Sequence, residues 1–315
     1  MKLSIVVPCY NEENNVDLFY QEVTKTFSNK KIKYEIIFIN DGSRDGTLIR
    51  LKDIASNAKE HIKIIDFSRN FGKEAGMYAG LKESSGEYVC IIDVDLQQHP
   101  SLILEMINIL EGNPDYDSVA AYQEKRHDPF FRKIFSLLFY KIINKISDIE
   151  FVPGASDFRL LKRNMVNAIL EMSEYYRFSK GIFSFVGFNT YYMPYEADKR
   201  ANGSSKWSFW KLFKYAIDGI VSFTTAPLRF AAYFGILISF FAFIYFIVLI
   251  IQALVLGIDV PGYASTLGTV LFLGGIQLFA LGIIGEYLGR TYVETKRRPI
   301  YIAKDIITNK KQRKK

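Results

Sequence analysis

The stretch Leu3–Glu13, LSIVVPCYNEE, joins a short apolar run to a polar cluster, and this combination recurs through the first half of the chain. Further strand-length apolar runs, each followed by turn-forming residues, lie at 34–40, 62–67 and 88–93. Between the four runs lie patterns typical of helices, at about 12–28, 45–58, 73–84 and 100–111. Alternation of this kind predicts an α/β sandwich with a mainly parallel sheet.

Each predicted strand is followed by a polar cluster. The clusters are Asn11-Glu12-Glu13, Asp41-Gly42-Ser43, Arg69-Asn70 and Asp93-Val94-Asp95. In open parallel sheets, ligands bind outside the carboxyl ends of the strands. We therefore expect a binding site at this edge of the sheet. Cys9 and Cys90 lie inside strand-like runs, so we expect buried thiols rather than a disulfide or a zinc site.

The charge of the chain is unevenly distributed. Its 315 residues carry a net charge of +7, and their 49% apolar content excludes a disordered or fibrous protein. Residues 1–198 hold 24 basic and 28 acidic side chains. By contrast, 199–229 hold six basic side chains and one acidic one, and 287–315 hold ten basic and two acidic side chains. A basic pI suggests nucleic acid as a partner. The excess of basic side chains lies instead on both sides of a nearly uncharged block, so we expect no nucleic-acid partner.

The nearly uncharged block is residues 230–286, in which Asp259 and Glu286 are the two charged side chains. There are 29 uncharged residues between Arg229 and Asp259, and 26 more before Glu286. A helix rises about 1.5 Å per residue and a hydrocarbon core is about 30 Å thick, so each run is long enough to cross a membrane. The sequence predicts a hairpin of two transmembrane helices.

The basic flanks predict the orientation of this hairpin. The link around Asp259 has no Lys or Arg, whereas 199–229 and 287–315 are rich in both, so the positive-inside rule places both flanks in the cytoplasm. A strand-length run rather than a signal-peptide core follows Met1, which also favours a cytoplasmic N-terminus. We expect a two-span protein of the cell inner (plasma) membrane, with residues 1–198 as a cytoplasmic catalytic domain and 287–315 as a basic cytoplasmic tail. This anchor leaves room for homo-oligomers.

Two segments place aromatic, aliphatic and basic residues at helical spacing, at 130–146 and 208–223. Basic amphipathic helices of this composition lie in the headgroup layer of membranes. Ordinary core-facing helices are the alternative. We predict an interfacial helix at 130–146 and a juxtamembrane amphipathic helix within 199–229.

Two of the polar clusters contain residue types suited to a nucleotide ligand. Asp93 and Asp95, followed by Gln97, form a hard, oxygen-rich group that suits Mg²⁺ or Mn²⁺ bound with a diphosphate, although a lone D-x-D is also common in solvated turns. Asp41 is placed to accept hydrogen bonds from a nucleobase or ribose, whereas Asp45 is suited to capping the next helix.

Three motifs carry a resemblance to a known family: Val6–Glu13 (VVPCYNEE), Asn40–Thr47 (NDGSRDGT) and Asp93–Gln97 (DVDLQ). Together they resemble the family 2 glycosyltransferases of the GT-A fold. Arg69–Lys73 (RNFGK) and the two spans narrow the resemblance to polyprenyl-phosphate glycosyltransferases. These include bacterial undecaprenyl-phosphate glucosyltransferases and, more distantly, dolichol-phosphate mannose synthases. The resemblance covers nearly the whole chain.

The resemblance implies roles for residues at matching positions. The nucleotide-sugar would be bound by Pro8, Tyr10, Glu12, Asp41 and Asp93. The divalent metal, Mg²⁺ or Mn²⁺, would be bound by Asp93, Asp95 and Gln97. The acceptor phosphate would be bound by Arg200, Ser205 and Lys206, and Asp157 matches the catalytic base or the carboxylate that orients the acceptor.

The implied activity is metal-dependent, inverting transfer of a sugar from a nucleotide-sugar, such as UDP-glucose or UDP-N-acetylglucosamine, to polyprenyl phosphate. The product would serve cell-envelope glycan modification. A phosphate monoester has a second pKa of about 6, so a general base has little to remove and both roles stay open for Asp157. A processive polysaccharide synthase would need more spans and a Q-x-x-R-W motif, which the sequence lacks. A non-catalytic scaffold is disfavoured by the intact Asp41, Asp93 and Asp157.

Overall fold

The computed structural model describes residues 2–123, 138, 140–147, 149–196, 209–256 and 262–309. The chain divides into a sheet unit (residues 1–145, 149–219 and 299–315) and a hairpin unit (146–148 and 220–298). Arg200, Ser205 and Lys206, predicted to bind the acceptor phosphate, lie outside the described residues. So does most of the interfacial helix predicted at 130–146, of which residues 140–146 are helical.

The first half of the sheet unit alternates strands and helices as the sequence predicts. The strands are β1 (Leu3–Cys9), β2 (Tyr34–Asn40), β3 (His61–Phe67) and β4 (Tyr88–Ile91), and the helices are α1 (Val16–Phe27), α2 (Thr47–Asn57), α3 (Lys73–Glu83) and α4 (Leu102–Gly112). β1 pairs in parallel with β2 and β4, and β2 pairs in parallel with β3. The carboxyl ends of all four strands therefore meet at one edge.

Helices cover both faces of this sheet because its strands are apolar on both sides. Ile5 and Val7 of β1 belong to one core cluster with Phe19 of α1. Val6 points to the opposite face, since successive side chains of a strand alternate. There it lies against Gly80 of α3, where any side chain would overlap Val6. The glycine thus lets α3 lie close to the sheet.

The second half of the sheet unit extends the sheet. It contains β5 (Ser118–Gln123), β6 (Ala155–Lys162), β7 (Thr190–Tyr195), α6 (Arg163–Glu171) and α7 (Ser179–Phe185). The strand order is β7-β5-β6-β4-β1-β2-β3-β8. Four of the seven pairings are parallel, so the predicted mainly parallel α/β sheet is confirmed. Cys9 and Cys90 are buried and free, as predicted.

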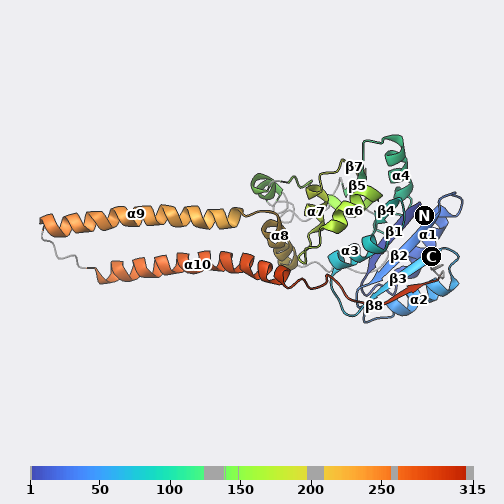
Figure 1. Ribbon diagram of the computed structural model, residues 1–315, viewed down its shortest axis with the longest axis horizontal. Helices are drawn as coiled ribbons and strands as arrows, with labels where there is room; N and C mark the ends of the chain where they lie inside the picture. Colours follow the sequence, from blue (N-terminus) through green and yellow to red (C-terminus); the bar gives the residue numbers. More distant parts are fainter. Residues whose placement is uncertain are drawn as a thin grey trace. The chain divides into compact units, whose positions relative to one another are not determined.

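The edge strand β8 (Ala303–Thr308) follows the hairpin in sequence and pairs antiparallel with β3 (Figure 1). Asn309 fastens its end, because the Oδ1 atom accepts the backbone N–H of Ile62 (3.0 Å) and Nδ2 donates to the carbonyl of Glu60 (2.8 Å). The segment 287–315, predicted as a basic tail, therefore contains a strand of the sheet.

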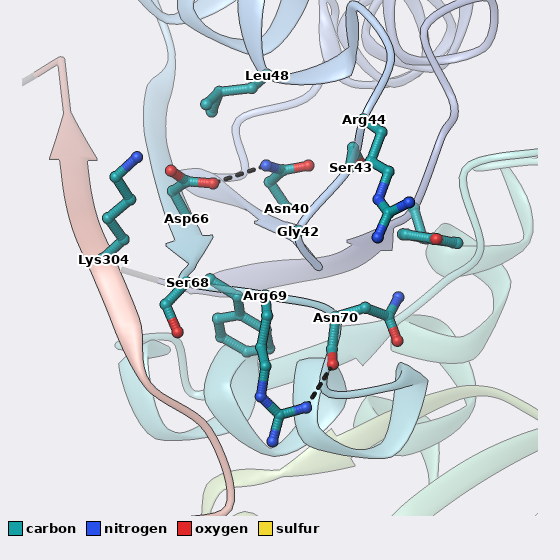
Figure 2. Close-up of a pocket in the computed structure, with 12 residues that line it drawn as sticks. Asn40, Gly42, Ser43, Arg44, Leu48, Asp66, Ser68, Arg69, Asn70 and Lys304 are labelled. Atoms are coloured by element: carbon teal, nitrogen blue, oxygen red, sulfur yellow. Dashed lines mark hydrogen bonds between the residues drawn. The ribbon is translucent and has the colours of Figure 1, made fainter.

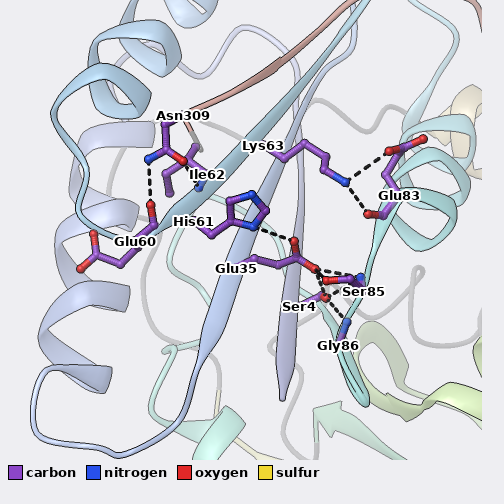
Figure 3. A network of polar contacts seen from close by, with 10 residues as sticks. All are labelled: Ser4, Glu35, Glu60, His61, Ile62, Lys63, Glu83, Ser85, Gly86 and Asn309. Atoms are coloured by element: carbon purple, nitrogen blue, oxygen red, sulfur yellow. Dashed lines mark hydrogen bonds and ion pairs between the residues drawn. The ribbon is translucent and has the colours of Figure 1, made fainter. Parts of the chain in front are cut away.

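A buried polar network lies at the amino-terminal ends of β1 to β3 (Figure 3). The side chain of Glu35 accepts hydrogen bonds from the hydroxyls of Ser4 (2.6 Å) and Ser85 (2.7 Å), and Nδ1 of His61 lies 3.1 Å from it. Burial opposes ionisation of Glu35, but these hydrogen bonds and the charge of Lys63 outweigh it and lower the pKa of the carboxyl. The network joins neighbouring strands to the loop before β4.

The hairpin unit contains the two predicted apolar helices, α9 (Ala226–Leu256) and α10 (Tyr263–Thr295). They follow α8 (Phe209–Phe223), which lies where the juxtamembrane helix was predicted. The candidate span of α9 is Ala226–Gln252, 27 residues long, and its most apolar 18-residue window has a mean hydropathy of 2.9. The candidate span of α10 is Thr266–Thr295, 30 residues long, and the corresponding window has a mean hydropathy of 2.1. At about 1.5 Å per residue, both exceed a hydrocarbon core about 30 Å thick.

Candidate active site

A cavity of about 350 Å³ opens at the carboxyl ends of β1, β2 and β3, where the polar clusters were predicted to meet (Figure 2). Its walls are Tyr10, Asn40, Gly42, Ser43, Arg44, Leu48, Asp66, Phe67, Ser68, Arg69, Asn70 and Lys304. The volume is that of a small-molecule site. Arg44, Arg69 and Lys304 contribute positive charge, which suits a ligand that carries phosphate groups.

The loop after β2 supports the loop after β3 in the wall of this cavity. The Asp41 carboxylate accepts the backbone N–H groups of Phe71 (2.6 Å) and Gly72 (3.0 Å). Gly42 has a φ of +62°, and a Cβ atom there would overlap the backbone of Arg69. The conformation therefore favours glycine, and the close approach requires it. Burial raises the pKa of Asp41, although the two N–H donors oppose this effect.

Asn40 and Asp66 connect the ends of β2 and β3 inside the cavity wall. Nδ2 of Asn40 donates to Oδ1 of Asp66 (2.7 Å), and the two residues are 2% and 7% exposed. Within the described part of the chain, the Oδ1 atom of Asn40 is buried without a hydrogen-bond partner. A buried acceptor left unpaired costs free energy. A ligand that donates a hydrogen bond here would recover that cost.

A cluster of three charged side chains lies past the end of β4. The Lys73 ammonium lies 2.8 Å from Oδ1 of Asp93 and 2.9 Å from Oδ2 of Asp157. Asp157 comes from β6, whose antiparallel pairing with β4 aligns Ile91 with Arg159 and so brings Asp157 toward Asp93. The three charged side chains are 39%, 36% and 21% exposed, so a ligand can reach them from solvent.

The charges in this cluster shift the pKa values of two carboxyls in opposite directions. Burial opposes ionisation of Asp157, but the charges of Lys73, Lys180 and Arg159 outweigh it and lower the pKa of Asp157 to about 2. Burial and the nearby charge of Asp157 raise the pKa of Glu74 to about 7. Asp157 is therefore ionised at neutral pH, whereas Glu74 changes its protonation there.

The D-x-D segment supplies oxygen ligands of the kind that Mg²⁺ and Mn²⁺ prefer. Asp93 is partly exposed, and Oδ1 of Asp95 accepts the N–H of Gln97 (3.2 Å). Leu96, between Asp95 and Gln97, has a φ of +57°, which leucine rarely adopts. Among the described residues, no group of three or more His, Cys, Asp or Glu side chains could enclose an ion. Two carboxylates and an amide fit an ion that completes its coordination with substrate phosphates.

The residues predicted to bind the nucleotide-sugar differ in their placement. Tyr10 lines the cavity, and Asp41 supports its wall. Glu12 accepts a hydrogen bond from Nδ2 of Asn15 (2.6 Å), and Pro8 packs against α3. Neither of them is among the described residues that line the cavity. Their roles stay predictions.

The sequence left three residues near the site without a role. Lys73 belongs to the RNFGK segment that helped to define the resemblance, so its motif was visible but its partners were not. Lys304 was part of the predicted basic tail, and it reaches the cavity because β8 joins the sheet. Arg159 lies two residues after Asp157, and no sequence pattern indicated a role for it.

Comparison with known proteins adds independent information. Residues 4–170 match Glycosyl transferase family 2, and residues 226–291 match the GtrB C-terminal hairpin. A candidate glycosyltransferase of Bacillus subtilis (strain 168), CsbB, is 48% identical over 303 residues, which cover 96% of this chain and 91% of the relative. The bactoprenol glucosyl transferase of Shigella phage SfV is 40% identical over 305 residues, which cover 97% of this chain and 99% of the relative.

Two further similarities concern a third relative and a solved structure. The prophage bactoprenol glucosyl transferase homolog of Escherichia coli (strain K12) is 40% identical over 306 residues, covering 97% of this chain and 99% of the relative. A solved glucosyl-3-phosphoglycerate synthase from Mycobacterium tuberculosis, in complex with Mg²⁺ and uridine-diphosphate, is 16% identical with a TM-score of 0.49, covering 70% of this chain and 77% of that one. The mostly parallel α/β sheet, its polar carboxyl edge and the apolar hairpin agree with the two family matches: the chain belongs to glycosyl transferase family 2 and is a glycosyltransferase of the GT-A fold with a GtrB C-terminal hairpin.

Proposed function

We propose that this glycosyltransferase transfers glucose from UDP-glucose to polyprenyl phosphate at the cytoplasmic face of the cell membrane, with inversion at the anomeric carbon. The relatives named bactoprenol glucosyl transferase support glucose as the sugar and a polyprenyl carrier as the acceptor. Both match over nearly their full length, which favours the same overall activity. The lipid-linked sugar would then serve cell-envelope glycan modification.

The observation that carries the proposal is the Lys73–Asp93–Asp157 cluster at the same sheet edge as the 350 Å³ cavity. Lys73 follows the cavity-lining residue Asn70 by three positions. A nucleotide in the cavity would direct its phosphates toward this cluster. Fixed charges at the point where a leaving group gains charge stabilise the transition state.

In the proposed reaction, an oxygen of the acceptor phosphate forms a bond to the anomeric carbon while the bond from that carbon to the donor diphosphate breaks. The bonding electrons leave with UDP. The acceptor phosphate is already largely ionised at neutral pH, because its second pKa is about 6. Asp157, with a pKa of about 2, is a weak proton acceptor. We therefore assign Asp157 the orienting role rather than that of a general base.

Asp93, Asp95 and Gln97 would hold the divalent ion, Mg²⁺ or Mn²⁺, together with the donor diphosphate. When bound, the ion supplies positive charge that stabilises the departing diphosphate. The Lys73 ammonium, 2.8 Å from Asp93, adds a positive charge from the chain itself. It also fixes the position of Asp157 relative to the donor side of the site.

The course of the chain supports a catalytic domain on one membrane face. Residues 149–219 before the hairpin and 299–315 after it belong to the same folded sheet unit. A chain that leaves one folded body and returns to it must cross the membrane an even number of times, which agrees with two spans. The basic flanks favour the cytoplasm as that side.

The test is incubation of the purified full-length protein with polyprenyl phosphate and a panel of labelled UDP- and GDP-sugars, with Mg²⁺, with Mn²⁺ and with a chelator. We expect a lipid-linked glucose product from UDP-glucose that depends on the metal. Asp95→Asn should lose this product, whereas the exposed Asp53→Asn in α2 should keep it.

Three outcomes would contradict the proposal. Absence of lipid-linked product with every donor would favour a non-catalytic scaffold. Release of a polymer without a lipid-linked monosaccharide would favour a processive synthase. A preference for another sugar or nucleotide would contradict only the assignment of UDP-glucose as donor. The assignment of polyprenyl phosphate as acceptor would stand.

A further inference from the structure

Arg159 is a buried cation two residues from Asp157 on β6. The residue is 4% exposed, and its positive charge is near enough to Asp157 to help lower the pKa of that carboxyl. Its guanidinium carbon lies 3.6 Å from the centre of the Phe183 ring, and Nη2 donates to the carbonyl of Ser156 (3.0 Å). Packing thus fixes the guanidinium beside the catalytic cluster.

The interactions that Arg159 makes do not offset the free-energy cost of burying its charge. Among the residues that the structure describes, Arg159 forms no ion pair with a carboxylate, and its Nε atom is buried without a hydrogen-bond partner. Asp157, the carboxylate that acts on it, is already paired with Lys73. Burying a charge in this way is costly unless an anion binds it. The site therefore favours a bound anion.

Arg159 lines a small cavity together with Lys180, which comes from α7. The other walls include the hydroxyl-bearing Ser184 and the aromatic side chains of Tyr140, Phe151, Phe183 and Tyr192. The described lining holds two cations and no carboxylate. The cavity volume is about 20 Å³, which is room for one oxygen-sized group.

We infer that Arg159 and Lys180 form a subsite for the phosphate of the acceptor, with one phosphoryl oxygen in the small cavity and the prenyl chain leaving past its aromatic walls. This inference rests on the proposed function. Asp157 would then separate two anion sites, with the donor diphosphate on the side of Lys73 and Asp93 and the acceptor phosphate on the side of Arg159. The subsite adds to the three acceptor residues predicted from the sequence.

The arrangement would solve an electrostatic difficulty of the reaction. The nucleophile is a phosphate dianion, and it must approach an anionic diphosphate past the ionised Asp157. Two cations on the acceptor side offset that repulsion and hold a phosphoryl oxygen in a fixed direction. Removing one of them should weaken acceptor binding more than donor binding.

The test compares wild type with Lys180→Gln and Arg159→Lys, with Lys52→Gln, an exposed lysine in α2, as the charge-matched control. Initial rates are measured against a short-chain polyprenyl phosphate and, separately, against UDP-glucose. We expect Lys180→Gln to raise the KM for the acceptor about tenfold with the KM for UDP-glucose unchanged, because a charge-assisted contact is lost. Inorganic phosphate should compete with the acceptor in wild type and compete less in Lys180→Gln.

Lys180 is partly exposed, so its substitution is tolerated more readily than that of the buried Arg159, and thermal unfolding in detergent checks both variants. An acceptor KM in folded Lys180→Gln equal to that of Lys52→Gln would overturn the inference. So would a rise in the KM for UDP-glucose alone, which would assign the cations to the donor diphosphate. If wild type forms no lipid-linked product at all, the proposed function fails instead.

Discussion

At the scale of single residues, Lys73 has the largest part among the cations that keep Asp157 ionised. One ammonium lies within hydrogen-bond distance of carboxylates from two strands, Asp93 after β4 and Asp157 on β6. The opposite charges of Lys73 and Asp157 favour the ionised form of each, so the pKa of Asp157 is lowered. An Asp157 that remains ionised cannot take a proton effectively, but it can hold Lys73 and orient an approaching phosphate.

Asp157→Asn tests this orienting role. We expect turnover to fall about 10- to 100-fold, because a charged group near the reacting atoms is lost, while the KM for UDP-glucose stays near that of wild type. Steady-state rates with both substrates varied give the two parameters. Asp53→Asn, an exposed carboxylate in α2, is the control. Turnover equal to that of the control would exclude any catalytic role for Asp157.

Glu74 gives a prediction about pH and stability. Its carboxyl accepts the backbone N–H of Ser179 (3.1 Å), and burial raises its pKa to about 7 from 4.5. Between these values the folded chain binds the proton and the unfolded chain does not, so this group makes stability fall as pH rises. The slope is at most about 1.4 kcal/mol per pH unit.

Thermal unfolding in detergent from pH 4.5 to 7.5 measures this contribution. Glu74→Gln should lack the fall that wild type shows over this range, whereas the exposed Glu105→Gln in α4 should retain it. A Glu74→Gln slope identical to that of wild type would show that the carboxyl does not titrate there.

At the scale of elements, β6 and β8 complete the site by pairing with the apolar strands β4 and β3. β6 brings Asp157 and Arg159 beside the end of β4 by antiparallel pairing. β8 brings Lys304 to the 350 Å³ cavity by pairing with β3. The sequence predicts β1 to β4 because each is a strand-length run in which apolar residues predominate. β8 reads AKDIIT, in which charged residues on an exposed edge hide the strand pattern.

Asn309→Ala tests whether β8 supports the cavity. The substitution leaves the N–H of Ile62 and the carbonyls of Glu60 and Ala58 without their side-chain partner. We expect a loss of about 1–3 kcal/mol in the stability of this edge, and a higher KM for UDP-glucose because Lys304 is displaced. Proteolysis near the C-terminus and donor kinetics measure the two effects.

Gln21→Ala, an exposed amide in α1, is the matched control for Asn309→Ala. Donor kinetics and proteolysis of Asn309→Ala equal to those of the control would show that the cavity does not depend on the attachment of β8.

At the scale of the whole molecule, the hairpin and its basic flanks predict the membrane topology. The native thiols of Cys9 and Cys90 are 1% and 0% exposed, so a labelling reagent should react with an introduced cysteine and not with them. We expect Asp259→Cys, in the link between the spans, to react with an impermeant maleimide in intact cells. Ser28→Cys, exposed after α1, should react only after the cells are opened. The reverse pattern would place the catalytic domain on the outer face.

The sequence by itself determined the alternation of strands and helices, the polar edge of the sheet, the D-x-D segment and the two apolar spans, because these depend on local composition and periodicity. It also located the net charge of +7 in the flanks of the hairpin. Only the tertiary structure decided that Lys73 joins Asp93 to Asp157 and that Lys304 reaches the cavity. Those contacts join residues that lie far apart in the chain, and strand pairing across the sheet, which no local pattern specifies, brings them together.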